Sequence, residues 1–269
     1  MPKINNVGQS EHTVTKQEIL LDTINAVYYA LYGIKKKHGY NITFNWIDAN
    51  SGCGKNLSCN CDGSPVIFQE SMMQKKWPHM IYCVEKDPEN IDSLKKSMIQ
   101  NRFVRYFNCD HNEIIPTILT EIGDSPYGIL YHDPNGEPSW NMLIDAANIQ
   151  NTRKLDFLIH MSATNGVKRL SRFGRSDLYN SVQKINKKHW YILPCHHIGS
   201  DAEQWCFLFG TNLEHFNSLK RIGYARIDES AGEAILNVVN HKKNTSPSDM
   251  IAPQKPLNAF FRSGLYGCR

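Results

Sequence analysis

The stretch Thr43-Phe-Asn-Trp-Ile-Asp48, followed by Ala49-Asn-Ser-Gly-Cys-Gly54, predicts a short strand that runs into a glycine-containing turn. In doubly wound α/β folds, ligands bind beyond the carboxyl ends of the strands, near the point at which strand order reverses. Glycines at such a turn allow positive φ and a close approach of the backbone to a ligand. A glycine-rich turn is also common as an ordinary strand-to-loop connection. Whether this turn binds a ligand must therefore be judged from the sequence that follows.

The rest of the chain alternates between helical and strand-like patterns. Strands are expected at residues 43–48, 79–85, 104–109, 127–133, 155–161, 189–194 and 204–210. Helices are expected at 18–37, 65–76, 88–100, 111–122 and 138–149, and helical sequence resumes between 165 and 185. This alternation predicts an α/β fold with a mostly parallel seven-stranded sheet and helices on both faces. The short polar segment before the last strand predicts a hairpin, and hence one antiparallel strand.

Three regions are expected along the chain. Residues 1–40 form an N-terminal helical segment, 41–243 form the main domain, and 244–269, rich in Pro and Ser, form a C-terminal extension. No apolar run approaches the roughly 20 residues of a membrane-spanning helix. The polar residues 1–17 lack an apolar signal core, which favours a cytoplasmic protein.

The amino-acid composition excludes few classes of protein. With 269 residues, 41% hydrophobic and 21% charged, the chain can bury a core without disulfides or metal. Of the eight cysteines, Cys83, Cys109 and Cys206 lie within or at the ends of apolar, strand-like runs, where free cysteine is a common small hydrophobe, and the cytosol disfavours disulfides. A net charge of +4 permits a nucleic-acid partner without requiring one.

Glu85 ends the second expected strand and precedes Lys86-Asp87-Pro88. A carboxylate in that place can accept hydrogen bonds from both ribose hydroxyls of a nucleoside cofactor. Its distance in sequence from Gly54 exceeds the roughly 20 residues usual for dinucleotide enzymes, and the turn lacks a full G-x-G-x-x-G pattern, so a nicotinamide cofactor is disfavoured. The alternative is an exposed acid at a strand end.

Two further acids follow strands. Asp110 comes after the third strand, where it could accept a hydrogen bond from an adenine amine. Alternatively it is a helix N-cap, with Glu113 three residues on. After the fourth strand, Asp133-Pro134-Asn135-Gly136 has a fixed φ at Pro134 and a turn-permitting Gly136. Such a rigid loop can aim the Asp133 carboxylate at an amino group, although the same four residues also form common β-turns.

In their order and spacing, these motifs resemble the three-Cys-motif partner proteins, a bacterial and phage-associated family regarded as methyltransferases. The matching residues are 47–54, Gly63-Ser64-Pro65, Glu85-Lys86-Asp87-Pro88, Asp110, and Asp133-Pro134-Asn135-Gly136 with Trp140. The resemblance covers residues 43–210. It implies a Rossmann-like class I methyltransferase fold that binds S-adenosylmethionine through Asp48, Asn50, Gly52, Gly54, Glu85 and Asp110, with Asp133, Pro134 and Asn135 at the reacting group.

The expected reaction is methyl transfer to a base amino or ring position of DNA or RNA. The Asp-Pro-x-x motif is similar to the Asp-Pro-Pro-aromatic loop of amino-methyltransferases, but Asn135 and Gly136 leave out the stacking aromatic, for which Trp140 or Tyr131 could substitute. A basic segment, Lys168, Arg169, Arg172 and Arg175, could follow a phosphate backbone, or could be a solvated helix face.

Two other functions remain open: a non-catalytic, S-adenosylmethionine-binding subunit of a larger bacterial or phage system, and a small-molecule methyltransferase. Cys53, Cys59 and Cys61, together with Cys83, could bind zinc. Their C-x₅-C-x-C spacing is not that of the usual structural zinc sites, so no metal is expected.

Overall fold

The computed structural model describes residues 13–56, 59–124, 126–134, 136–162, 178–195, 205–214 and 216–239. Their main sheet has eight strands in the order β10-β8-β9-β7-β6-β1-β4-β5. The strands are β1 Phe44–Asp48, β4 His79–Val84, β5 Val104–Phe107, β6 Gly128–His132, β7 Leu155–Ser162, β8 His189–Cys195, β9 Trp205–Thr211 and β10 Ala225–Arg226. A separate hairpin pairs β2 (Lys55–Asn56) with β3 (Cys61–Asp62).

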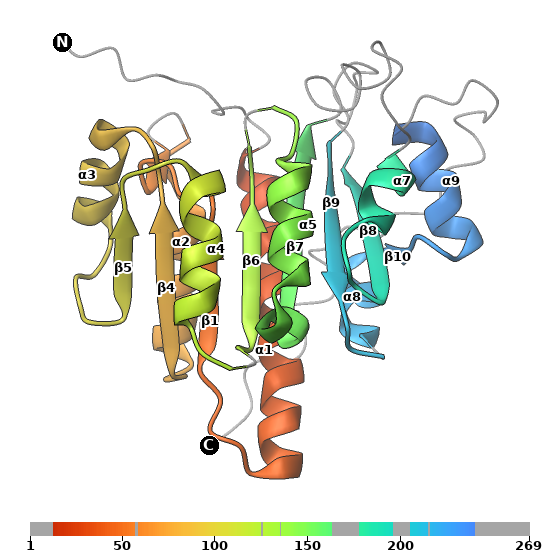
Figure 1. Ribbon diagram of the computed structural model, residues 1–269, viewed down its shortest axis with the longest axis horizontal. Helices are drawn as coiled ribbons and strands as arrows, with labels where there is room; N and C mark the ends of the chain where they lie inside the picture. Colours follow the sequence, from red (N-terminus) through yellow and green to blue (C-terminus); the bar gives the residue numbers. More distant parts are fainter. Residues whose placement is uncertain are drawn as a thin grey trace.

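Helices cover both faces of the sheet (Figure 1). One face carries α1 (Thr13–His38), α2 (Ser64–Gln74), α3 (Pro88–Ser97) and α8 (Asn217–Ile222). The other face carries α4 (His111–Glu121), α5 (Trp140–Asn148), the 3-10 helix η1 (Gln150–Lys154), α7 (Leu178–Gln183) and α9 (Ser230–Val239). No helix in the described part of the chain is long and apolar enough to cross a membrane.

Alternating side chains of β1 fill both layers of the core. Phe44 and Trp46 pack on the α1/α2 face, with ring centroids about 5 Å from Phe68 of α2, whereas Ile47 belongs to the opposite cluster. Side chains alternate between the faces of a strand, so Asp48 lies on the same face as Trp46. The side chain that ends β1 is therefore directed toward α1 and α2.

The N-terminal helix is an integral part of the core. Its residues Ile24, Val27 and Leu31 are buried against the sheet and α2. Burying each such side chain stabilises the fold by about 1.5–3 kcal/mol. Because α1 packs so closely on the sheet, its first turns are fixed relative to the strand ends.

The structure corrects the predicted sheet in two details. It has eight strands, because Ala225–Arg226 pairs antiparallel with β8, so that both β9 and β10 run against the other strands. A strand of two residues has too few positions for an alternating pattern to be recognised. The β2–β3 hairpin lies in a region predicted as loop, for the same reason. Most of the helix predicted at 165–185 and all of the extension at 244–269 lie outside the described residues.

Candidate active site

The order of the strands reverses beside β1, so the carboxyl edge of the sheet has a topological switch point there. The chain runs from β1 to β4 and β5 on one side, then crosses to β6 and β7 on the other. Ligands of open α/β sheets bind at such a switch point. The predicted residues after β1, β4, β5 and β6 all lie at this edge, the upper one in Figure 1.

The two glycines of the turn after β1 have different surroundings. Both have positive φ, +61° at Gly52 and +77° at Gly54. A Cβ on Gly54 would lie 2.7 Å from Leu94 Cδ1 and 3.1 Å from Leu94 Cα, whereas a Cβ on Gly52 would meet no atom within 4 Å. Gly54 is therefore needed to pack the turn on α3, and Gly52 leaves the turn open on its other side.

Asp48 is fully buried and organises this turn. Its Oδ2 accepts hydrogen bonds from Ser64 Oγ at 2.6 Å and Trp46 Nε1 at 3.2 Å, and its Oδ1 accepts one from the Asn50 amide at 3.1 Å. Burial raises the pKa of Asp48 to about 7, although these hydrogen bonds act in the opposite direction. The carboxyl is directed into the protein, where it ties the turn to the start of α2.

Glu85 joins the ends of β1 and β4. Its Oε2 accepts a hydrogen bond from the Gly52 amide at 2.9 Å, and its Oε1 accepts one from the Asp87 amide at 2.9 Å. A carboxylate has about four acceptor sites, so capacity for ribose hydroxyls remains. Asn50 lies close by in the turn, and its buried Oδ1 has no hydrogen-bond partner among the described residues.

Asp110 is the N-cap of α4. Its Oδ1 accepts a hydrogen bond from the Asn112 amide at 2.8 Å, and this bond lowers the pKa of the carboxyl. The capping alternative raised by the sequence is confirmed. An adenine contact by the same residue stays a prediction.

Asp133 follows β6 and lies in a cluster of polar side chains. Lys16 Nζ and the Tyr131 hydroxyl donate to its Oδ2 at 2.8 and 3.1 Å, and His160 Nδ1 lies 2.7 Å from its Oδ1. Burial alone would raise the pKa of Asp133, but the neighbouring Lys16 and His160 outweigh this effect and hold it well below its usual range. Burial lowers the pKa of His160. The site thus holds an ionised carboxylate beside a neutral imidazole.

The loop after Asp133 is anchored at both ends. His132 is fully buried, and its Nε2 accepts a hydrogen bond from the Ser139 amide at 3.0 Å. The Ser139 hydroxyl lies 2.8 Å from His111 Nε2. Burial lowers the pKa of His132 to about 3, so the ring is neutral and can accept this bond. Pro134 lies within the anchored loop, and Asn135 lies outside the described residues.

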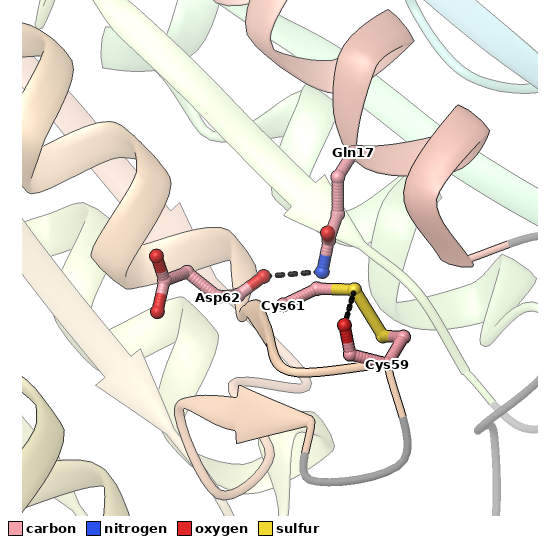
Figure 2. Close-up of a disulfide and its surroundings, with 4 residues drawn as sticks. All are labelled: Gln17, Cys59, Cys61 and Asp62. Atoms are coloured by element: carbon pink, nitrogen blue, oxygen red, sulfur yellow. Dashed lines mark hydrogen bonds between the residues drawn. A yellow bond between two sulfur atoms is a disulfide. The ribbon is translucent and has the colours of Figure 1, made fainter.

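The first turns of α1 complete the edge. Besides Lys16, they supply Gln17, whose Nε2 donates to the backbone oxygen of Asp62 in β3 (Figure 2). Beside this contact, Cys59 and Cys61 form a disulfide. The general expectation that disulfides are disfavoured does not hold for this pair, because the hairpin turn brings the two cysteines together. No three His, Cys, Asp or Glu side chains of the described residues gather as a metal site.

Some members of this site were not found from the sequence. Lys16 lies 117 residues before Asp133, and no motif marks it. His160 carried a weak signal, since it is the one polar residue within the apolar run 157–161 of β7. The predicted basic residues Lys168, Arg169, Arg172 and Arg175 lie outside the described residues, so their contact with nucleic acid stays a prediction.

No family model matches this chain, and no curated protein matches it. Among solved structures, it is similar to protein LPL1258 from Legionella pneumophila, with 14% identity, a TM-score of 0.53, and coverage of 82% of this chain and 91% of that one. It is also similar to an Agrobacterium tumefaciens SAM-dependent methyltransferase, with 11% identity, 77% and 64% coverage and a TM-score of 0.47. A third is M. jannaschii TYW2 in complex with AdoMet, with 11% identity, 76% and 77% coverage and a TM-score of 0.42.

The likeness to the Legionella protein shows a shared fold, an α/β sheet with helices on both faces. The predicted α/β fold with a mostly parallel sheet is confirmed, apart from the number of strands and of antiparallel strands. At these identities the likeness concerns the fold alone, and the match to three-Cys-motif partner proteins stays a resemblance.

Proposed function

We propose that this chain is an S-adenosylmethionine-dependent methyltransferase that acts on a base amino or ring position of a nucleic acid. One observation carries the proposal. Across the switch point, an open glycine turn bridged to Glu85 lies on one side of β1, and the ionised Asp133 lies on the other. The switch point of the sheet would be the binding site, the glycine turn and Glu85 would bind the cofactor, and Asp133 would bind the substrate.

The turn fits the cofactor. The free space at Gly52 admits a ligand against the backbone, and Glu85 has spare acceptor capacity for two ribose hydroxyls. The Asn50 oxygen lacks a donor, which costs about 1–3 kcal/mol for a buried polar group. A hydroxyl or ammonium of the cofactor would recover that cost. S-adenosylmethionine, when bound, supplies a methyl group activated by a positively charged sulfur.

Asp133 would orient the acceptor amine. Its carboxylate accepts hydrogen bonds from N–H groups, as it now does from Lys16. A general base works best with a pKa near the working pH, so a carboxylate whose pKa is held low is a weak base. We therefore assign Asp133 to holding the amine rather than to removing its proton.

Lys16 must leave Asp133 before a substrate amine can bind there. This same contact favours a second candidate, a non-catalytic cofactor-binding subunit, in which the Lys16–Asp133 ion pair keeps the acceptor position permanently filled. The two candidates share cofactor binding and differ in turnover.

Titration calorimetry with S-adenosylmethionine tests the shared part, and absence of heat at high protein concentration would refute both candidates. Transfer of tritiated methyl groups to DNA, tRNA and rRNA then separates enzyme from subunit. Asp133→Ala should abolish transfer while retaining cofactor binding. Asp92→Asn, which removes an exposed carboxylate on α3, is the control and should leave both unchanged. Full transfer by Asp133→Ala would remove Asp133 from the mechanism.

A further inference from the structure

The edge of the sheet opposite the candidate active site carries exposed aromatic side chains. Tyr29 and Tyr32 on α1 are 60% and 50% exposed, and Tyr40, just after the helix, is 52% exposed. Figure 1 shows the second half of α1 running down beyond the amino ends of the strands. Exposed aromatic groups gathered on one region of a soluble protein commonly mark a binding surface.

Tyr29 and Tyr32 belong to a group of rings that we call the aromatic track: Tyr28, Tyr29, Tyr32, the buried Trp77, His79 and Phe103. Its two parts meet where His79 Nδ1 lies 2.9 Å from the Trp77 carbonyl oxygen. Tyr28 lies 5.1 Å from both Tyr29 and Trp77, measured between ring centroids, and Trp77 lies 6.3 Å from Tyr32. The His79 ring lies 6.0 Å from that of Phe103. The track therefore runs from α1, past the start of β4, to the segment before β5.

Basic groups lie over the rings of the track. Lys75 Nζ is 5.4 Å from the centroid of Tyr28, Lys35 Nζ is 4.9 Å from that of Trp77, and the Arg102 guanidinium is 5.0 Å from that of Phe103. The three stretches that build this surface, residues 23–43, 71–84 and 93–109, contain no Asp or Glu. The surface is thus both aromatic and positively charged.

A pocket of about 420 Å³ adjoins the track at the same edge. Its lining includes Tyr40, Thr43 and Tyr127, with Lys154 Nζ 4.8 Å from the Tyr127 centroid and Asp124 as an acceptor. The amide of Phe44, next to Thr43, donates to the carbonyl of Pro78, which joins the pocket wall to the track. This volume lies within the usual range of small-ligand pockets, about 300–1,000 Å³.

We propose that the aromatic track binds single-stranded nucleic acid, with one base entering the adjoining pocket. The exposed rings of the track, Tyr29, Tyr32 and Phe103, offer stacking faces to unpaired bases, and the neighbouring Lys and Arg groups pair with phosphates. A duplex hides its base faces, so the rings would gain nothing from one. The proposal does not depend on methyl transfer, because the track lies at the opposite edge of the sheet from Asp133.

The test is fluorescence anisotropy of the full chain with labelled 20-mers of dT and rU, and with a duplex of equal length, over a range of salt concentrations. Tyr29→Ala/Tyr32→Ala should weaken single-strand binding by roughly tenfold or more. Lys35→Gln/Lys36→Gln/Lys37→Gln should flatten the dependence of log K on log salt by about 0.7 for each phosphate that the variant no longer neutralises. Lys220→Gln/Arg221→Gln on α8 is the control and should bind as the unchanged chain does.

The expected result is preference for single strands, abolished in the tyrosine variant while its thermal unfolding is unchanged. Three results would overturn the proposal: no binding to either single strand at low salt, undiminished binding by the tyrosine variant, or equal binding of the duplex. Self-association abolished by Tyr29→Ala/Tyr32→Ala would also overturn it, since the surface would then join two copies of the chain.

Discussion

Substituting alanine at Gly52 and at Gly54 should separate cofactor binding from stability. Both residues have positive φ, so an L-residue at either position carries a strain of about 1–2 kcal/mol. Only at Gly54 does the new methyl group also collide with other atoms. The two variants therefore share the strain of an L-residue at positive φ, and only Gly54→Ala adds the cost of the collision.

The extra cost at Gly54 comes from α3. The added Cβ would lie 2.7 Å from Leu94 Cδ1, which can rotate away, but also 3.0 Å from Ser97 Cβ and 3.1 Å from Leu94 Cα, which move only with the helix. Overpacking of this kind costs about 1–3 kcal/mol. We expect Gly54→Ala to lower the free energy of unfolding by about 2–5 kcal/mol, and Gly52→Ala by about 1–2 kcal/mol.

The loss of affinity for S-adenosylmethionine should follow the opposite order, with the larger loss in Gly52→Ala. The methyl group of Gly52→Ala occupies the open side of the turn, so this variant should lose affinity for S-adenosylmethionine while remaining folded. Urea unfolding gives the free energies, and calorimetry gives the affinity. A smaller stability loss for Gly54→Ala than for Gly52→Ala would refute the packing of the turn on α3. Undiminished cofactor affinity of Gly52→Ala would refute the assignment of this turn.

Three further predictions concern charged groups. Glu85→Gln should weaken S-adenosylmethionine binding about tenfold or more by calorimetry, because hydrogen bonds to a charged group contribute about 1.5–3 kcal/mol; unchanged affinity would exclude Glu85 as a ligand. Lys16→Met should raise the pKa of His160, which Lys16 now lowers, and a histidine titration by NMR that does not shift would contradict their proximity. His132 has a folded-state pKa of about 3, below its unfolded value, so the unfolded chain binds the extra proton as the pH falls through 6.5. Relative to His132→Asn, the unchanged chain should lose about 2 kcal/mol of stability between pH 7 and 5, and parallel pH profiles would contradict this.

Most of the fold could be predicted because its strands are long and apolar. The strand expected at 155–161 is observed as Leu155–Ser162, and that expected at 43–48 as Phe44–Asp48. The failures were short elements: β2, β3 and β10 have two residues each, and β10 pairs with β8, a strand distant in sequence. Local pattern defines an element only when the element is long enough to show a period.

The site residues that could be predicted are those that directly follow the parallel strands. Glu85 and Asp133 lie at the same edge because parallel strands bring their carboxyl ends together. Lys16 reaches that edge through the packing of α1 across the sheet, and no local pattern encodes this contact. Asp110 shows a different difficulty, since the sequence permitted both a cap and a ligand contact, and only geometry assigned the cap.

Asp48 and Asp133 show how surroundings give two similar sequence positions opposite roles. Each residue ends or follows a central strand and precedes a turn, yet burial raises the pKa of Asp48 to about 7, while Lys16 and His160 hold that of Asp133 low. The donors around Asp48 are neutral, so its proton can be kept, and its negative charge would be disfavoured by that of Asp133. Lys16 therefore stabilises the negative charge of Asp133, beside β1, in addition to occupying the position of a substrate amine. A substrate amine that replaces Lys16 must bind to a carboxylate that is already ionised.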